Sequence, residues 1–148
     1  MALTKEERMN WKLIVSLSGF GLAMGIASVL GFTRGVEGVL WLIIGLVCAV
    51  WIARTTLAKQ FLHGFMVGLI GGAIAPLIQV IFFSAYLSNN PETTEQFAQV
   101  PVGLSVRSFI LVMTPIIGIL SGVVLGLLAW AVSKIIKPTA NKGLSKRY

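Results

Sequence analysis

One uninterrupted apolar stretch decides the fold: residues 61–87 have the sequence FLHGFMVGLIGGAIAPLIQVIFFSAYL. This stretch contains no Asp, Glu, Lys or Arg. A helix needs roughly 17–25 mainly apolar residues to cross about 30 Å of hydrocarbon, so the segment is long enough to span a bilayer. Apolar stretches of the same kind occur at residues 11–32, 36–53 and 109–132. The sequence therefore predicts an all-α integral membrane protein with four transmembrane helices.

The composition of the whole chain supports this interpretation. Of the 148 residues, 56% are hydrophobic and 11% are charged, whereas soluble domains carry about 25% charged residues. We expect a single membrane domain over residues 1–148, because no segment outside the spans is long enough for a soluble core. An outer loop is expected at 88–107, with a short helix beginning near Asn90-Pro91-Glu92. A basic cytoplasmic tail is expected at 133–148.

The apolar run of the first span is longer than the 7–15 residues typical of a signal peptide, and no small-residue cleavage site follows it. We therefore interpret this segment as a retained span. A cleaved signal peptide is the alternative, because basic residues precede the run.

The basic residues predict the orientation in the membrane. Two of the twelve Lys and Arg residues, Arg34 and Arg107, fall on one side of the predicted spans. Because positive residues in short flanks stay in the cytoplasm, we expect an up-and-down bundle with both termini inside. The net charge of +7 then suits anionic lipid headgroups rather than nucleic acid. The other ten basic residues are Lys5, Arg8, Lys12, Arg54, Lys59, Lys134, Lys137, Lys142, Lys146 and Arg147.

Three of the spans carry glycine at four-residue spacing, which places each set on one face of its helix. Small residues allow helix backbones to approach closely in lipid. We predict that these stripes pack spans three and four against each other or against span one. The alternative is that a stripe docks another protein, a flat lipid or a pigment. The stripes consist of Gly64, Gly68 and Gly72 in span three, Gly118, Gly122 and Gly126 in span four, and Gly21 and Gly25 in span one.

The second span has one interior glycine, Gly45, and no repeated stripe of small residues. Close helix packing should therefore matter less there. We expect leucine at Ala49 to disturb the bundle less than leucine at Gly68 or Gly122.

Two prolines define a candidate cavity. Pro76 and Pro115 lie in the outer halves of antiparallel spans, and each removes a helical hydrogen bond and can kink its helix. Paired kinks can open a cavity of the kind that transporters use, with Gln79 and Thr114 as polar lining. A structural role is the stronger interpretation, because these polar side chains can satisfy the freed backbone groups.

The sequence contains no recognisable catalytic, cofactor or metal site. No charged residue lies deep in a span, which argues against proton relays and ion pathways. His63 is the single histidine, so it cannot form a triad or a histidine cluster. We expect it to make one interfacial hydrogen bond and to tolerate replacement by glutamine. The protein is therefore predicted not to be an enzyme and to need no cofactor.

The order of features from Thr56 to Val132 resembles a family of small, uncharacterised bacterial membrane proteins with four helices. The matching stretches are Phe61-Leu62-His63-Gly64-Phe65 at the start of span three, Tyr86 followed by Asn90-Pro91-Glu92, and the glycine-rich last span with basic residues at its end. The resemblance implies a location in the bacterial cytoplasmic (inner) membrane. It brings no catalytic residues with it.

The predicted function is that of a non-catalytic accessory or scaffold subunit in a larger membrane assembly. Its expected partners are membrane lipids and other membrane subunits, or further copies of itself. The alternative function is a small channel or carrier formed by oligomerisation. Identifying co-purifying subunits would separate these two classes.

Overall fold

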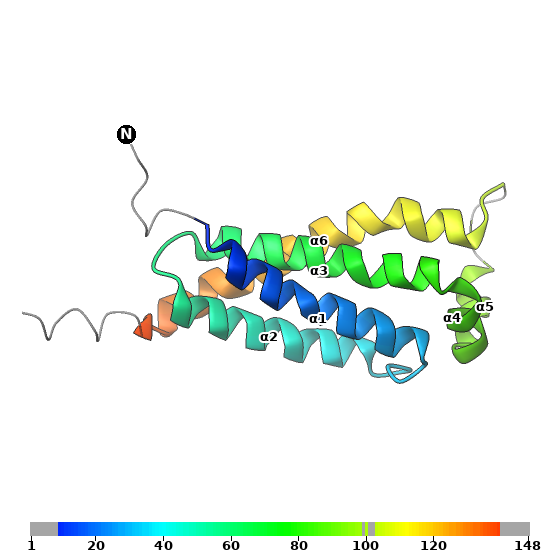
Figure 1. Ribbon diagram of the computed structural model, residues 1–148, viewed down its shortest axis with the longest axis horizontal. Helices are drawn as coiled ribbons and strands as arrows, with labels where there is room; N and C mark the ends of the chain where they lie inside the picture. Colours follow the sequence, from blue (N-terminus) through cyan, green and yellow to red (C-terminus); the bar gives the residue numbers. More distant parts are fainter. Residues whose placement is uncertain (1–8, 99, 101–102, 140–148) are drawn as a thin grey trace, which may run out of the picture.

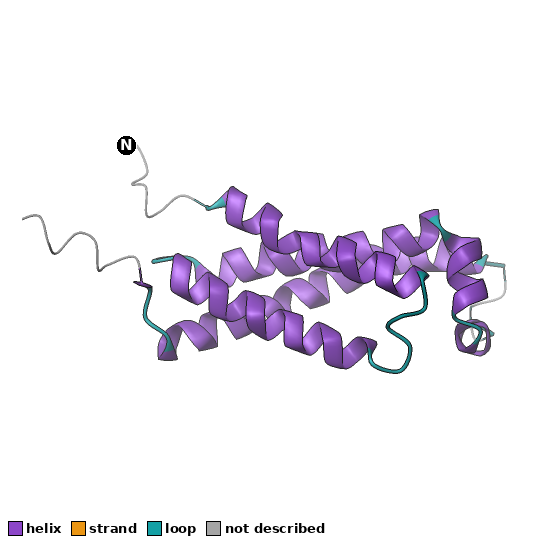
Figure 2. Ribbon diagram, turned by 60° about the horizontal axis from the view of Figure 1, so that its bottom comes forward, coloured by secondary structure: helices purple, strands orange, loops and turns teal. Residues whose placement is uncertain are grey.

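The computed structural model describes residues 9–98, 100 and 103–139. Within these ranges the chain forms α-helices joined by loops and no strand (Figures 1 and 2). Four helices are long and apolar enough to cross a membrane, and two short helices follow the third of them. In chain order the helices are α1 (Trp11–Val29), α2 (Glu37–Thr55), α3 (Gln60–Ile81), α4 (Phe83–Asn89), α5 (Glu92–Phe97) and α6 (Val106–Ile135).

The first, second and fourth predicted spans agree with α1, α2 and α6 to within three residues at either end. The predicted third span is wrong at its outer end, because α3 ends at Ile81 rather than near residue 87. A helix of 22 residues is about 33 Å long, so α3 alone is sufficient to cross the hydrocarbon. The apolar residues after Ile81 are therefore not needed to span the membrane.

These residues form α4, which lies across the end of the bundle (Figure 1). The backbone leaves the helical conformation at Phe82, with φ −101° and ψ 37°. Arg107 holds the last turn of α3, since its Nε and Nη2 atoms donate hydrogen bonds to the Val80 carbonyl oxygen at 3.1 and 2.8 Å. The same guanidinium group lies 6.0 Å from the centre of the Phe83 ring. A hydropathy profile does not reveal this turn, because the residues on both sides of it are apolar.

The predicted outer loop is partly helical. The expected short helix is confirmed as α5, which begins at Glu92 directly after Pro91. At the other end of the predicted loop, α6 already begins at Val106, where the Ser105 side chain caps it by accepting a hydrogen bond from the Ser108 N–H at 3.1 Å.

Local capping explains where α1 begins and ends. The Oδ1 atom of Asn10 accepts a hydrogen bond from the Leu13 N–H at 3.1 Å, which satisfies a free donor of the first turn. Beyond the last turn, Gly31 adopts φ 77°, a conformation that favours glycine. Its N–H donates to the Ser28 carbonyl oxygen at 2.9 Å, as in a helix C-terminal cap. The helix therefore stops before residue 32.

The four long helices lie side by side with α3 in contact with all of the others (Figure 1). It packs most extensively against α6 and then against α1, while α2 packs mainly against α6. The largest core cluster joins all four long helices toward the end where α1 begins and α6 ends. It consists of Ile14, Leu17, Cys48, Ala49, Ile52, Val67, Leu125 and Ala129.

Candidate functional site

The glycine stripes of α3 and α6 face each other. A Cβ atom built on Gly68 would overlap the Ser121 carbonyl oxygen and lie 2.7 Å from the Cα atom of Gly122. A Cβ atom on Gly64 would lie 2.6 Å from the Leu125 carbonyl oxygen. Real Cβ atoms essentially never approach other atoms this closely, so only glycine fits at these positions.

The remaining glycines of the two stripes occupy the same interface. A Cβ atom on Gly72 would lie 2.8 Å from the Ser121 hydroxyl oxygen. A Cβ atom on Gly118 would lie 3.0 Å from the Leu69 carbonyl oxygen, and one on Gly126 would lie 2.9 Å from the ring of Phe61. The two helices are therefore in backbone contact along most of their shared length.

The glycines of α1 contact a different face of α3. A Cβ atom on Gly21 would overlap the backbone of Gly71, and one on Gly25 would lie 3.1 Å from the Cα atom of Ala75. Gly71 and Ala75 were not part of the predicted stripe, although they share its four-residue spacing. All eight glycines of the predicted stripes are buried by the chain's own helices. This geometry corresponds to the packing interpretation.

The four residues of the candidate cavity do not converge. Pro76 and Gln79 line a pocket of about 220 Å³ between α2, α3 and α6. We call it the outer pocket, and we use outer for the end of the bundle at which α1 ends and α2 begins. The Nε2 atom of Gln79 donates a hydrogen bond to the hydroxyl oxygen of Ser28 at 3.0 Å. Its carboxamide therefore also ties α3 to α1.

Thr114 and Pro115 do not line the outer pocket. Thr114 is buried, and its hydroxyl group donates a hydrogen bond to the Ile110 carbonyl oxygen at 2.8 Å within its own helix. Pro115 is exposed, on the side of α6 that points away from the other helices. A cavity centred on paired prolines is therefore wrong, because the two prolines face in different directions.

Sequence reasoning missed two side chains of α2 that line the outer pocket, Glu37 and Trp41. They lie four residues apart, which places them on one face of the helix. Both are half-buried. Within the described part of the chain, the Glu37 carboxylate makes no hydrogen bond or ion pair. Ser121 of α6 completes the polar lining of this pocket.

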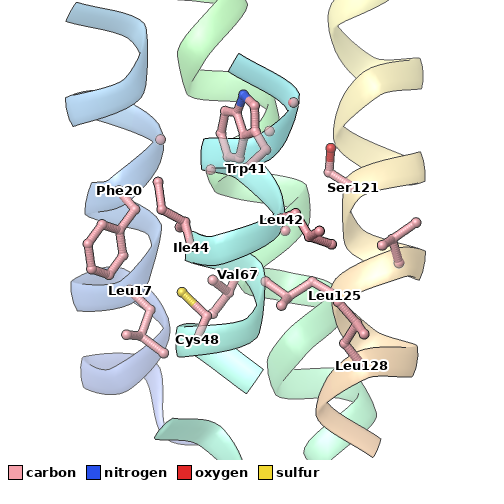
Figure 3. A pocket seen from close by; sticks show the side chains of 17 residues that line it. Leu17, Phe20, Trp41, Leu42, Ile44, Cys48, Val67, Ser121, Leu125 and Leu128 are labelled. Carbon is pink, nitrogen blue, oxygen red and sulfur yellow. The ribbon is translucent and has the colours of Figure 1, made fainter. Parts of the chain in front are cut away.

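The outer pocket adjoins a deeper apolar cleft of about 250 Å³, because Trp41, Gly72 and Ser121 line both. Figure 3 shows this cleft between α1, α2, α3 and α6. The indole nitrogen of Trp41 points away from the apolar side chains at the opposite end of the cleft (Figure 3). These apolar side chains include Leu17, Phe20, Leu42, Ile44, Cys48, Val67, Leu125 and Leu128.

The cleft exists because α2 stands away from the other helices in its outer half. A Cβ atom on Gly38 would have no neighbouring atom within 4 Å. One on Gly45 would meet only the tips of Leu125 and Leu128, at 4.0 and 3.9 Å. Gly38 therefore borders open space and Gly45 has room for a side-chain atom, unlike Gly64 and Gly68 of α3.

Polar side chains close the outer end of the bundle near the pocket. The Nδ2 atom of Asn90 donates to the carbonyl oxygens of Ser28 and Tyr86 at 2.9 and 2.8 Å. Asn89 donates to the Val29 carbonyl oxygen at 3.0 Å. Two of these bonds reach the last turn of α1: Asn89 satisfies the Val29 carbonyl oxygen, and Asn90 gives a further donor to the Ser28 carbonyl oxygen. The sequence gives no local signal of this arrangement, since Asn89 and Asn90 lie about sixty positions from Val29 and Ser28.

Charge at this end is unevenly compensated. The Arg34 Nε atom lies 3.2 Å from both carboxylate oxygens of Glu92, whereas Glu37 has no such partner among the described residues. Burial raises the pKa of the Tyr86 hydroxyl above its ordinary value, and the carboxylates of Glu37 and Glu92 raise it further. Glu37 is thus the carboxylate in the lining of the outer pocket, and among the described residues it has no ion-pair partner.

At the opposite end, His63 is buried, with 2% of its surface exposed. Its Nε2 atom accepts a hydrogen bond from the Asn10 N–H at 3.0 Å, and its Nδ1 atom lies 2.8 Å from the Lys59 carbonyl oxygen. This pair of partners assigns the neutral ring with its proton on Nδ1. The expectation of a single hydrogen bond is wrong, because His63 uses both ring nitrogens: Nε2 links it to the N-cap residue of α1, and Nδ1 lies against the N-cap residue of its own helix, α3.

The chain matches no protein-family model, no curated protein and no solved structure. Among the described residues, no group of three or more His, Cys, Asp or Glu side chains could hold a metal ion. The outer pocket places the carboxylate of Glu37, which makes no hydrogen bond to other described residues, beside an apolar cleft.

Proposed function

We propose that this protein is a non-catalytic accessory or scaffold subunit of a larger membrane assembly, and that α2 is the helix that contacts the partner. The proposal rests on the exposure of α2. In the most apolar 18-residue segment of α2, 22% of the residues are buried inside the bundle, whereas 56% are buried in the corresponding segment of α3. A membrane helix that contributes so little to its own bundle has a large surface available for a second protein.

The outward face of α2 is also shaped for docking. It carries a shallow groove of about 530 Å³ that ends in a tryptophan and an arginine near the end of the helix. Shape complementarity supplies much of the association energy between helices in lipid, so a groove of this kind suits the helix of another membrane subunit. Its lining residues are Leu46, Val47, Val50, Trp51, Arg54 and Thr55.

The test is site-specific photo-crosslinking in native membranes, followed by purification in a mild detergent. A crosslinker at Val47 on α2 should capture a stoichiometric foreign subunit. The matched control is Leu120 on α6, which is 61% exposed and should capture lipid alone. Capture at Leu120 without capture at Val47, or purification as a single species without partners, would overturn the assignment of α2.

The proposed orientation is an up-and-down bundle in the bacterial cytoplasmic membrane with both termini inside. It is supported by the common end at which α1 begins and α6 ends (Figure 1). At that end Lys134 lies 5.2 Å from the centre of the Trp130 ring, an arrangement suited to a membrane interface facing anionic headgroups. The part of the basic tail beyond residue 139 lies outside the described residues.

Cysteine labelling tests this orientation. In a Cys48→Ala background, a cysteine at Glu95 should react with an impermeant reagent added to intact cells, while one at Lys59 should react after lysis alone. The reverse pattern would place both termini outside.

A small carrier or channel is the second candidate, because Pro76 and Gln79 line the outer pocket. This function requires a homo-oligomer and solute flux across liposomes that contain the purified protein. A monomer without flux in such liposomes would eliminate it.

A further inference from the structure

We propose that the cleft and the outer pocket together bind one single-chain amphiphile whose headgroup carries a cationic nitrogen. We call this combined site the amphiphile cleft. Its chain would occupy the apolar cleft, and its headgroup would lie between Glu37 and Trp41 in the outer pocket. The inference concerns binding alone, so it goes beyond the accessory role and does not depend on it.

The apolar cleft has the size and lining for an alkyl chain. Its volume of about 250 Å³ exceeds the roughly 150 Å³ of an engineered apolar cavity that admits benzene. Four helices contribute its apolar walls, and Gly38 and Gly45 line it along α2 without side chains of their own. An alkyl chain placed there would restore the contacts that α2 lacks with α3.

The outer pocket has the chemistry for a cationic nitrogen. Glu37 and Trp41 lie one turn apart on the same face of α2, with about 5–6 Å expected between their Cβ atoms. A carboxylate attracts the cation by charge, and an indole ring attracts it through its electron-rich face. A single nitrogen centre can therefore contact both groups.

The charges around the pocket select against other headgroups. The lining of the cleft and of the outer pocket contains no Lys or Arg. Neither arginine at this end lines the pocket: Arg34 pairs with Glu92, and the guanidinium group of Arg107 lies against the Val80 carbonyl oxygen and the Phe83 ring. An anionic headgroup would meet the carboxylate of Glu37 without a compensating cation. A neutral headgroup would leave that carboxylate unpaired.

Native mass spectrometry of the full chain in a non-ionic detergent tests the proposal. The probe is dodecyltrimethylammonium, whose charge does not change with pH. Laurate and dodecanol provide anionic and neutral headgroups on chains of the same length. We expect one saturable adduct with the cation and at least about tenfold weaker binding of the other two. Equal binding of all three compounds would overturn the selectivity argument.

Two variants test the two halves of the site. Glu37→Gln should weaken dodecyltrimethylammonium binding roughly tenfold, which corresponds to the loss of one charged contact. Gly45→Leu should eliminate the adduct, because its side chain would enter the apolar cleft. Glu95→Gln on α5 removes a carboxylate away from the cleft and should leave binding unchanged.

Unchanged affinity in Glu37→Gln, or equal losses in Glu37→Gln and Glu95→Gln, would refute the assignment of the headgroup. The Glu37 variant remains informative even if Gly45→Leu fails to fold, because the Glu37 side chain makes no hydrogen bond with other described residues. Loss of a co-purifying subunit would change neither result, so the binding site and the accessory function can fail separately.

Discussion

The α3–α6 pair and α2 are similarly apolar, yet they pack in opposite ways. The mean hydropathy of their most apolar windows is 2.0 for α3, 2.4 for α6 and 2.0 for α2. In the pair, glycines bring the two backbones into contact at positions such as Gly68 and Gly122. In α2, Gly38 borders open space, and a Cβ atom on Gly45 would make only ordinary van der Waals contacts. Hydropathy therefore does not determine which helices associate tightly.

The tightly packed pair stabilises the bundle, whereas the loosely packed outer half of α2 leaves space for a ligand. Between helices in lipid there is little hydrophobic driving force, so close packing supplies much of the association energy. The glycine-packed pair provides it along its length. By contrast, α2 is held mainly near its C-terminal end, where Cys48, Ala49 and Ile52 are almost completely buried. Its outer half diverges from α3 and leaves the amphiphile cleft.

The largest expected effect comes from breaking the tight pair. Gly68→Leu places a branched side chain where a Cβ atom already overlaps the Ser121 carbonyl oxygen. We expect a loss of about 3 kcal/mol or more in the free energy of unfolding, at the upper end for overpacked cores. Unfolding in mixed micelles measures this loss.

The control is Gly19→Leu on α1, because a Cβ atom at Gly19 has no neighbour within 4 Å. This variant should unfold like the wild type. Equal stability of the two variants would mean that backbone contact does not hold α3 and α6 together.

The next effect tests how α2 is anchored. Ala49 is completely buried although its helix has no glycine stripe. We expect Ala49→Leu to cost about 1–3 kcal/mol of unfolding free energy, still less than Gly68→Leu. Val47→Leu on the exposed face of the same helix is the control and should be neutral. A neutral Ala49→Leu would show that α2 is loose along its whole length.

Replacing His63, which lies at the end of the bundle opposite the outer pocket, should have an intermediate effect on stability. His63→Leu removes the acceptor of the Asn10 N–H, and the loss of this part-buried hydrogen bond should cost about 1 kcal/mol. Hydrogen exchange should therefore accelerate at the Asn10 amide and in the first turn of α1, while α2 keeps its protection. Unchanged exchange at Asn10 would contradict the linking role of His63.

The smallest effect concerns the exposed ion pair beside the connection to α2. Arg34 and Glu92 are close to half exposed, at 46% and 47%, and such pairs contribute about 0–1 kcal/mol. A double-mutant cycle with Arg34→Gln and Glu92→Gln should give a coupling energy in this range at low salt. A coupling well above about 1 kcal/mol would mean that this pair, rather than packing, positions the outer end of α2.

The candidate site was only partly predictable. Pro76 and Gln79 line the outer pocket, and both stand out in the sequence because polar and helix-breaking residues are uncommon in an apolar span. Their expected companions on α6 were wrong, since the sequence does not reveal which way a proline faces. Glu37 and Trp41 lie at four-residue spacing at the start of the second span, and that spacing was a usable signal.

The sequence by itself determined the four apolar spans, the clustering of basic residues and the glycine stripes. Each depends on a local property: length of apolar sequence, distribution of charge, or spacing on one helix. The tertiary structure decided that α3 ends at Ile81, that Gly71 receives α1, and that the outer half of α2 stands apart. These outcomes depend on contacts between residues far apart in the chain, such as Arg107 with Val80 and Gly21 with Gly71. Hydropathy and helix periodicity are properties of one segment at a time, so they contain no information about such contacts.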